Sequence, residues 1–168
     1  HNGLDMAGDL SLVFDFLKAP GEGQVTSQEK FNLLDALPFF DDFLDAEIWE
    51  IVNASDWLSM RAGESVLEEG ASDTAFYLII DGSVAVRKND IDIVELGKGD
   101  CFGEMGMLTG RPRSASICAA EDLTVAKLKE TIVSRLSLNC QVRFQKQFLL
   151  ALIGRLEHTT ARVAAETP

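Results

Sequence analysis

Residues 102–116, FGEMGMLTGRPRSAS, contain the side chains in this chain that are best suited to bind an anion. Several Gly and Pro residues make the stretch too irregular for a regular helix or strand, so its backbone N–H and C=O groups need other partners. The run GEMGML is long enough for a turn or two of helix that begins just after Gly103. Because the N-terminus of a helix presents unpaired N–H groups with partial positive charge, we expect this backbone to face an anion.

Side chains in the same stretch narrow the class of ligand. Pro112 fixes the backbone before Arg113, whose planar guanidinium suits phosphate oxygens, and Ser114 adds a hydroxyl donor. Glu104 is unsuited to a phosphate, but its carboxylate can accept hydrogen bonds from ribose hydroxyls. The combination indicates a sugar phosphate, and the alternative is a surface loop with a fortuitous arginine. We expect Arg111 to face solvent.

The elements that must position these residues fall into three parts. Residues up to about 55 look helical, with an apolar run at 9–20, a second helix that Ser27 could cap, and a third at about 41–53. From Trp57 onward, short β-branched and aromatic runs alternate with glycine turns, which is typical of an all-β sandwich or barrel. Within this part, AVRKNDIDIV predicts a hairpin that turns at Asn89-Asp90 and has one wet face.

The end of the chain, residues 139–165, reads as one long helix. Its apolar positions recur at alternating steps of four and three, the spacing of a coiled-coil seam. The seam consists of Leu149, Ile153, Leu156, Thr160 and Val163. We expect a homodimer through this helix, and the alternative is that the stripe packs on the β-structure.

Composition excludes several classes of function. The net charge of −12, from 27 acidic and 15 basic residues, argues against binding of nucleic acid by this chain segment. The three cysteines lack a CxxC spacing, which argues against a disulfide framework or thiolate metal site and fits a reducing cytoplasm. No apolar run approaches the roughly 20 residues that span a bilayer, so we expect no membrane association. No nucleophile–base pair or metal cluster stands out, and we expect no catalysis.

The stretch 102–116, preceded by FYLIIDGSVAV and IVELGKGDC, resembles the phosphate-binding cassette of the cyclic nucleotide-binding domain family. The resemblance covers roughly residues 31–163. It implies a mainly β fold with flanking helices: a double-stranded β-helix, or jelly-roll β-roll, with N-terminal helices and a long C-terminal helix. It also implies a domain at 31–168, with the β-roll at about 57–128 and the C-terminal helices at about 129–165. Residues 1–30 are left as a partly helical, unassigned extension.

The same resemblance implies roles for individual residues. Arg113 would pair with the cyclic phosphate and Ser114 would donate to it, while Glu104 would accept the ribose 2′-hydroxyl. The run GRLEHTTARV resembles the ligand-contacting helix of bacterial cAMP receptors, in which an arginine precedes a pair of hydroxyl residues that reaches the adenine. The implied ligand-binding residues are Gly103, Glu104, Met105, Arg113, Ser114, Arg155, Thr159 and Thr160.

The resemblance implies a regulatory domain that senses a cyclic nucleotide and relays binding through its C-terminal helix. The hydroxyl pair favours cAMP as the ligand, with cGMP as the alternative, and no cofactor is expected. The other function in view is a degenerate β-roll that binds no ligand and serves as a dimerisation or protein-docking module. Such domains typically lack the Arg or the Glu, whereas both are present here. For Thr159 and Thr160, the alternative role is hydrogen bonding to carbonyls one turn earlier.

Overall fold

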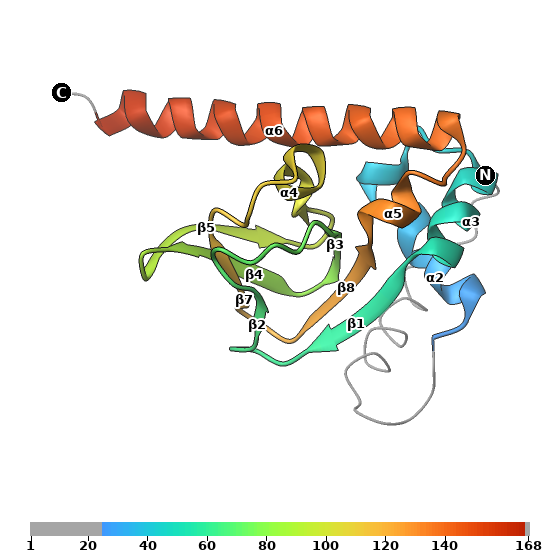
Figure 1. Cartoon of the computed structure of the whole chain (residues 1–168), viewed down its shortest axis with the longest axis horizontal. Helices are drawn as coiled ribbons and strands as arrows, with labels where there is room; N and C mark the ends of the chain where they lie inside the picture. Colours follow the sequence, from blue (N-terminus) through green and yellow to red (C-terminus); the bar gives the residue numbers. More distant parts are fainter. Residues whose placement is uncertain (1–24, 167–168) are drawn as a thin grey trace.

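A computed structural model gives the structure of the chain and describes residues 25–166. The apolar run expected to be helical at 9–20 lies outside the described residues. The strands form two antiparallel four-stranded sheets that face each other (Figure 1). The first sheet has the order β1 (Asp56–Met60), β8 (Leu123–Leu128), β3 (Phe76–Asp81) and β6 (Cys101–Phe102). The second has the order β2 (Ser65–Leu67), β7 (Ser116–Ala119), β4 (Ser83–Lys88) and β5 (Ile91–Gly97).

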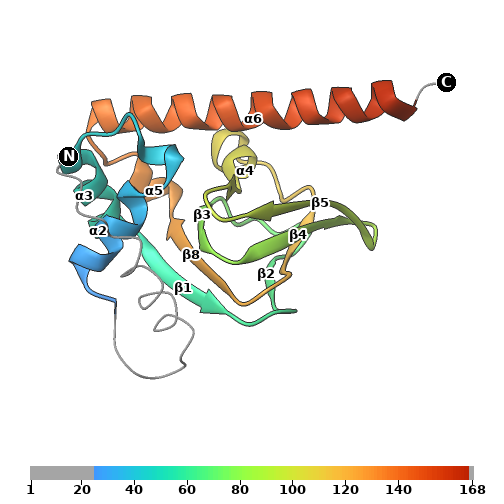
Figure 2. The ribbon, with the colours of Figure 1, turned by 180° about the vertical axis from the view of Figure 1, so that it is seen from behind.

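Helices precede, interrupt and follow the strands. Before them come α2 (Ser27–Asp35), the 3₁₀ helix η1 (Pro38–Phe40) and α3 (Asp45–Ala54). Between β6 and β7 lies α4 (Glu104–Thr109), and after β8 come α5 (Glu130–Val133) and α6 (Leu138–Glu166). The long α6 runs along one side of the molecule, across α4 and the sheets, in both the front and the back view (Figure 2). Within residues 25–166 we find no helix with the length and apolar character needed to cross a membrane.

Strand β3 joins two hydrophobic cores because both of its faces are buried. Phe76, Leu78 and Ile80 point into the core formed with the helices, whereas Tyr77 and Ile79 point into the core between the sheets. Side chains alternate between the two faces of a strand, so the continuous apolar run FYLII supplies both cores at once. The predicted mainly β fold with flanking helices is confirmed.

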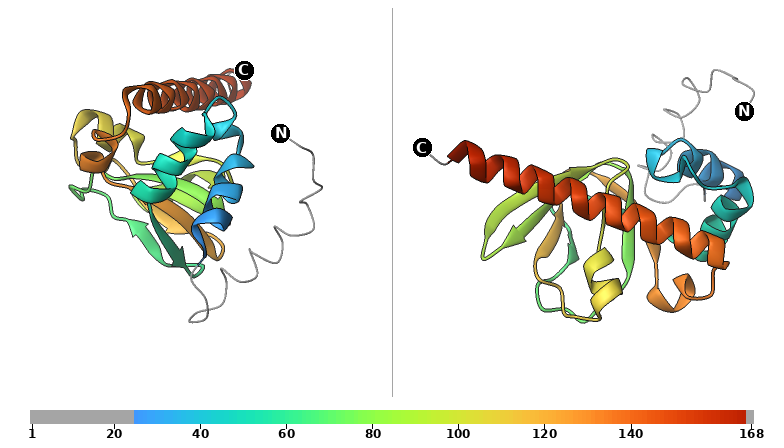
Figure 3. Two further views of the ribbon diagram at one scale, coloured as in Figure 1. Left: turned by 90° about the vertical axis from the view of Figure 1, so that its right-hand side faces the viewer. Right: turned by 90° about the horizontal axis from the view of Figure 1, so that it is seen from above.

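The core that packs against the helices anchors only the first part of α6. An aromatic cluster of Phe39, Phe40, Phe43, Phe76, Phe144 and Phe148 fills it, with ring centroids 4.7 to 6.5 Å apart. The buried residues of α6 are Cys140, Phe144 and Phe148. Residues 149–166, called here the distal half of α6, contain no fully buried residue, although Ala151 is partly buried against this core. The helix continues beyond that contact, as the end-on and top views illustrate (Figure 3).

Several local predictions are confirmed and two need correction. Asn89 and Asp90 form the hairpin turn between β4 and β5 with φ of 52° and 61°, and the long C-terminal helix is present. The cap of α2 is Thr26 rather than Ser27, because its side chain accepts from the Glu29 amide and Glu29 bonds back to the Thr26 amide. The helix expected at 41–53 starts instead at Asp45, since η1 and a turn occupy the preceding residues.

Candidate ligand-binding site

A cavity of about 190 Å³ lies beside the start of α4, over the β2-β7-β4-β5 sheet. Apolar side chains from the strands form its floor, and polar groups come from the cassette stretch and α6. Its lining consists of Leu67, Val86, Val94, Leu96, Phe102, Gly103, Glu104, Met105, Arg113, Ser114, Ala115, Ile117 and Arg155. We call it the cassette cavity. An apolar hollow with a few convergent polar groups is the usual form of a small-molecule site.

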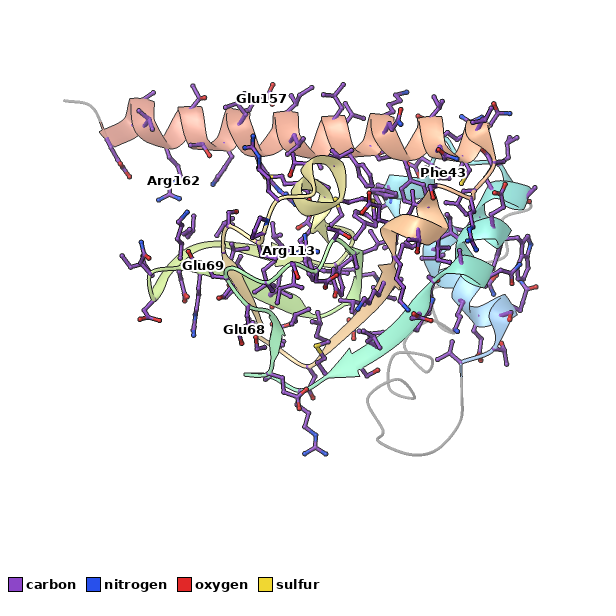
Figure 4. All side chains as sticks on the ribbon, in the orientation of Figure 1. Phe43, Glu68, Glu69, Arg113, Glu157 and Arg162 are labelled. Atoms are coloured by element: carbon purple, nitrogen blue, oxygen red, sulfur yellow. The ribbon has the colours of Figure 1, made fainter. Side chains whose placement is uncertain are left out.

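Arg113 is the buried cation of this cavity and lies in the middle of the roll (Figure 4), with 7% of its surface exposed. Its Nη1 donates to the Gly103 carbonyl at 2.9 Å and its Nη2 to the Ala75 carbonyl at 2.5 Å. Its Nε is buried and has no hydrogen-bond partner, and the Asp73 carboxylate lies 4.0 Å from its Nη2. A buried guanidinium held mainly by neutral carbonyls favours an anion at its free side.

Two glycines make room for the guanidinium of Arg113. A Cβ on Gly106 would lie 2.5 Å from Arg113 Nη1, and one on Gly103 would lie 3.2 Å from the same atom. Gly103 also has a φ of +87°, and its Cβ would meet the Ala75 carbonyl oxygen at 2.5 Å. Helix α4 begins just after Gly103, as the sequence predicts, and its first turn packs on the arginine.

Glu104 is almost completely buried, with 1% of its surface exposed, and pairs with Arg155. Nη1 of Arg155 donates to the Glu104 carboxylate, and its Nη2 donates to the Cys101 carbonyl. Since a carboxylate has about four lone-pair sites, Glu104 keeps capacity to accept further hydrogen bonds. The ion pair ties the distal half of α6 to the wall of the cassette cavity.

Asp73, which the sequence reasoning missed, supports Arg113 from the side away from the cavity. Its carboxylate accepts from the Ala75 amide at 2.8 Å and from the Tyr77 hydroxyl at 2.9 Å. Partial burial opposes its ionisation, but these hydrogen bonds, with Lys127 and Arg113 nearby, outweigh burial and hold its pKa below the usual value. An Asp two residues before the amide it accepts from is the pattern of an Asx turn, and that local signal could have revealed it.

Tyr77 links Asp73 to the start of the cassette. Its ring stacks on Phe102, with centroids 4.9 Å apart and planes at 6°, and Phe102 directly precedes Gly103. Burial and the hydrogen bond to Asp73 raise the pKa of the Tyr77 hydroxyl far above its usual value. This hydroxyl therefore stays protonated and acts as a donor to Asp73.

The cassette cavity brings together most of the predicted site residues: Gly103, Glu104, Met105, Arg113, Ser114 and Arg155. Thr159 lies instead on a groove of about 660 Å³ between α6 and β5, and Thr160 lines neither space. The hydroxyl of Thr159 donates to the Arg155 carbonyl at 3.0 Å, and that of Thr160 to the Leu156 carbonyl at 2.9 Å. Both residues thus make the bonds to the preceding turn that were their alternative role. Arg111 is exposed, as expected.

Burial protects two cysteine thiols from reaction. Burial raises the pKa of both the Cys101 thiol and the Cys140 thiol to about 12, with Glu104 and Glu50 adding to the respective shifts. These thiols are therefore protonated and unreactive at neutral pH. No group of His, Cys, Asp and Glu in residues 25–166 could hold a metal ion. The absence of catalysis stays a prediction.

Comparison with known proteins identifies the family. The family model described as the cyclic nucleotide-binding domain matches residues 57–139, which include all but the first residue of β1, the strands β2 to β8, α4 and Arg113. The chain belongs to the cyclic nucleotide-binding domain family. Residues 102–116 contribute the polar cassette groups of its cassette cavity, strands of the β-roll contribute the apolar floor, and the helices flank the β-roll.

The relatives of this cyclic nucleotide-binding domain include one protein named for cAMP and one named for cGMP. The cAMP-dependent protein kinase regulatory subunit of Aspergillus fumigatus is 35% identical over 97 residues, which cover 56% of this chain and 24% of the relative. The cGMP-dependent protein kinase of Plasmodium berghei is 32% identical over 114 residues, or 68% of this chain and 13% of the kinase. The domain thus spans about a quarter or less of these curated relatives' length.

A solved structure agrees with the fold over most of the chain. The cyclic nucleotide-binding domain from Methylobacillus flagellatus superposes with a TM-score of 0.73 at 25% identity, covering 84% of each chain. The predicted jelly-roll fold of the family is therefore confirmed. By fold and family, the chain contains a cyclic nucleotide-binding domain that is similar to part of a protein kinase regulatory subunit.

Proposed function

We propose that this domain binds cAMP and relays the binding event through α6. One observation carries the proposal: Arg113 is buried on the wall of the cassette cavity, and its Nε has no partner. A cyclic phosphate would supply the missing acceptor and the compensating charge. A charge-assisted hydrogen bond of this kind contributes about 1.5–3 kcal/mol, so the phosphate contact would dominate affinity.

The neighbours of Arg113 suit the rest of a sugar phosphate. Ser114 follows it on the cavity wall and offers a hydroxyl donor, while Glu104 offers a buried carboxylate. A ribose 2′-hydroxyl that donates to Glu104 would meet an acceptor already oriented by Arg155. Gly103 lies between these groups, where the lack of a side chain lets a ligand approach the backbone.

The state of Thr159 favours adenine over guanine. Because its hydroxyl hydrogen is directed to the Arg155 carbonyl, the oxygen is left as an acceptor. Adenine carries an amino donor at N6, whereas guanine carries an acceptor at O6. A base that reaches Thr159 from the cassette cavity would be accepted as adenine and disfavoured as guanine, which supports cAMP rather than cGMP.

The attachment of α6 supports a relay. The last fully buried residue of the helix is Phe148, and beyond the partly buried Ala151 the side chain of Arg155 bonds the distal half to Glu104 and Cys101. A ligand on Glu104 would share that carboxylate with Arg155, and it can shift α6 only to the extent that it binds one position of the helix more tightly than another. The proposed output is a change in the position of the distal half.

The outer face of α6 supports a homodimer. An apolar residue recurs at every seventh position of this face: Val142, Leu149, Leu156 and Val163. These residues and Ile153 expose between 43% and 67% of their surfaces. This stripe does not pack on the roll of its own chain, which was the alternative expectation. We propose that it meets the same stripe of a second copy.

The proposed domain extent remains residues 31–168, although α2 begins before it at Ser27. A reducing cytoplasm remains the expected location.

Isothermal titration calorimetry of the full chain with cAMP and with cGMP tests the proposal. We expect binding of cAMP, weaker binding of cGMP, and loss of at least about tenfold in affinity in Arg113→Ala. Arg111→Ala is the matched control, because Arg111 is exposed and lies outside the cassette cavity and should leave affinity unchanged. If neither nucleotide binds while the protein remains folded and dimeric, the domain is instead a docking module without a ligand.

A further inference from the structure

A second space continues from the cassette cavity along α6. The groove of about 660 Å³ shares Val94, Leu96 and Arg155 with the cavity, so the two spaces meet at the Arg155 side chain. The groove runs between α6 and β5. A nucleotide with its phosphate on Arg113 and its ribose on Glu104 would direct its base toward this junction. The polar groups that α6 places on the groove are therefore candidates to read the base.

Arg162 is the cationic group of α6 that remains available on this groove. It lies three residues after Thr159, so the two side chains share a face of the helix, with Cβ atoms about 5–6 Å apart. In Figure 4 it points from α6 toward the sheets, whereas Glu157 points away from them. Within residues 25–166 its side chain makes no hydrogen bond or ion pair, unlike that of Arg155, which is bound to Glu104 and Cys101. Glu95 lines the opposite side of the groove.

Thr159 and Arg162 together form a pair of one acceptor and one donor. While the Thr159 hydroxyl donates to the Arg155 carbonyl, its oxygen serves a ligand as an acceptor, and the Arg162 guanidinium can only donate. Adenine presents a complementary pair on one edge: the N6 amino group donates and N7 accepts. Guanine presents two acceptors on that edge, N7 and O6, and would leave O6 facing the Thr159 oxygen.

We propose that Arg162 is a base-contacting residue that donates a hydrogen bond to N7, which adenine and guanine share, while Thr159 accepts from N6 of adenine and carries the discrimination between the two bases. The inference rests on the proposed function, since it requires a cyclic nucleotide in the cassette cavity. It adds a residue from the distal half of α6 to the ligand contacts. The base would then hold the distal half of the helix at a second point, seven residues beyond Arg155.

Calorimetric titration with cAMP and 7-deaza-cAMP, in which a C–H replaces N7, isolates this contact. For the wild type, we expect 7-deaza-cAMP to bind about tenfold more weakly than cAMP. For Arg162→Ala, we expect cAMP to weaken by about the same factor and 7-deaza-cAMP to show no further loss. Arg162→Lys keeps a donor and should restore part of the difference. Arg111→Ala should behave like the wild type.

The outcomes separate this inference from the proposed function. If the wild type binds cAMP and 7-deaza-cAMP equally well, Arg162 does not contact N7 and only the inference is overturned. The same conclusion follows if Arg162→Ala still binds 7-deaza-cAMP more weakly than cAMP by the factor seen in the wild type. Tighter binding of cGMP than cAMP would overturn the adenine assignment while leaving cyclic nucleotide binding in place. Absence of binding by either nucleotide would overturn the proposed function itself.

Discussion

Arg155 of α6 and Glu104 of α4 are 51 residues apart in sequence and form an ion pair at the wall of the cassette cavity. Glu104 has 1% of its side chain exposed and Arg155 has 34%. The carboxylate is thus inside the domain, while the guanidinium reaches it from a helix whose distal half has no buried residue. The cassette cavity and the distal half of α6 meet at this ion pair.

Removal of the cation from this pair should destabilise the domain. In Arg155→Ala, Glu104 is left buried without its partner, and we expect a loss of about 2 kcal/mol, below the 3–5 kcal/mol typical of buried pairs because Arg155 is partly exposed. Urea unfolding at pH 7 measures the change. Adding Glu104→Gln to Arg155→Ala should recover part of the loss, because the neutral amide is less costly to bury. If Arg155→Ala unfolds at the wild-type urea concentration, the pair does not stabilise the fold.

Two glycines should respond in opposite directions to the same substitution. Gly103→Ala places a Cβ 2.5 Å from a backbone oxygen at a φ of +87°, so we expect a loss of about 1–3 kcal/mol and weaker nucleotide binding. Gly154→Ala meets nothing within 4 Å in mid-helix and should stabilise the domain by about 0.5–1 kcal/mol. Thermal unfolding of both variants gives the comparison. Equal effects would mean that backbone geometry at Gly103 is unimportant.

Asp73 should make stability depend on pH in the acid range. Because its pKa is lowered in the folded domain, its contribution is fully present above the unfolded value of about 3.9 and is lost as pH falls toward the folded pKa. We expect Asp73→Asn to cost about 1 kcal/mol at pH 7 and progressively less below pH 4. Urea midpoints from pH 7 to pH 3 test this, with Asp41→Asn as an exposed control. A constant difference across the range would contradict an ionised Asp73 as the cause.

The seam of α6 should control the oligomeric state. Leu156 has 67% of its surface exposed and lies in the seven-residue repeat, so Leu156→Asp should convert a dimer to a monomer without lowering cAMP affinity at Arg113. Glu157→Ala is a neighbouring control, since its side chain lies outside that repeat and points away from the roll (Figure 4). Sedimentation equilibrium distinguishes the two states. A wild-type protein that is monomeric at every concentration would refute the proposed dimer.

Local signals predicted the parts of the structure that depend on neighbouring residues. The glycines and proline around Glu104 and Arg113 indicate where the strand pattern breaks, and the seven-residue repeat indicates the long helix, because both patterns reside in short windows of sequence. Asn89-Asp90 likewise specifies its hairpin, since a type I′ turn requires positive φ at both residues.

Contacts between distant segments were beyond the reach of the same reasoning. The motif around Arg113 predicts an anion, but the Ala75 carbonyl and the Asp73 carboxylate that orient it come from a loop 38 to 40 residues earlier. The pairing of Arg155 with Glu104 depends on how α6 lies on the roll, which is set by Phe144 and Phe148 in the aromatic cluster. The sequence pattern of α6 also could not tell that both threonine hydroxyls bond to their own helix.

The distance between the last buried residue of α6, Phe148, and the end of the helix makes residues 149–166 a lever arm that amplifies displacement. Residues 149–166 extend about 27 Å at 1.5 Å per residue, so a tilt of about 10° at Phe148 would move the far end by about 5 Å. Arg155 lies less than halfway along this arm. A displacement of that guanidinium by the width of one hydrogen bond would therefore be magnified more than twofold at Glu166, and the helix would turn a change in a small cavity into a movement that a neighbouring surface can sense.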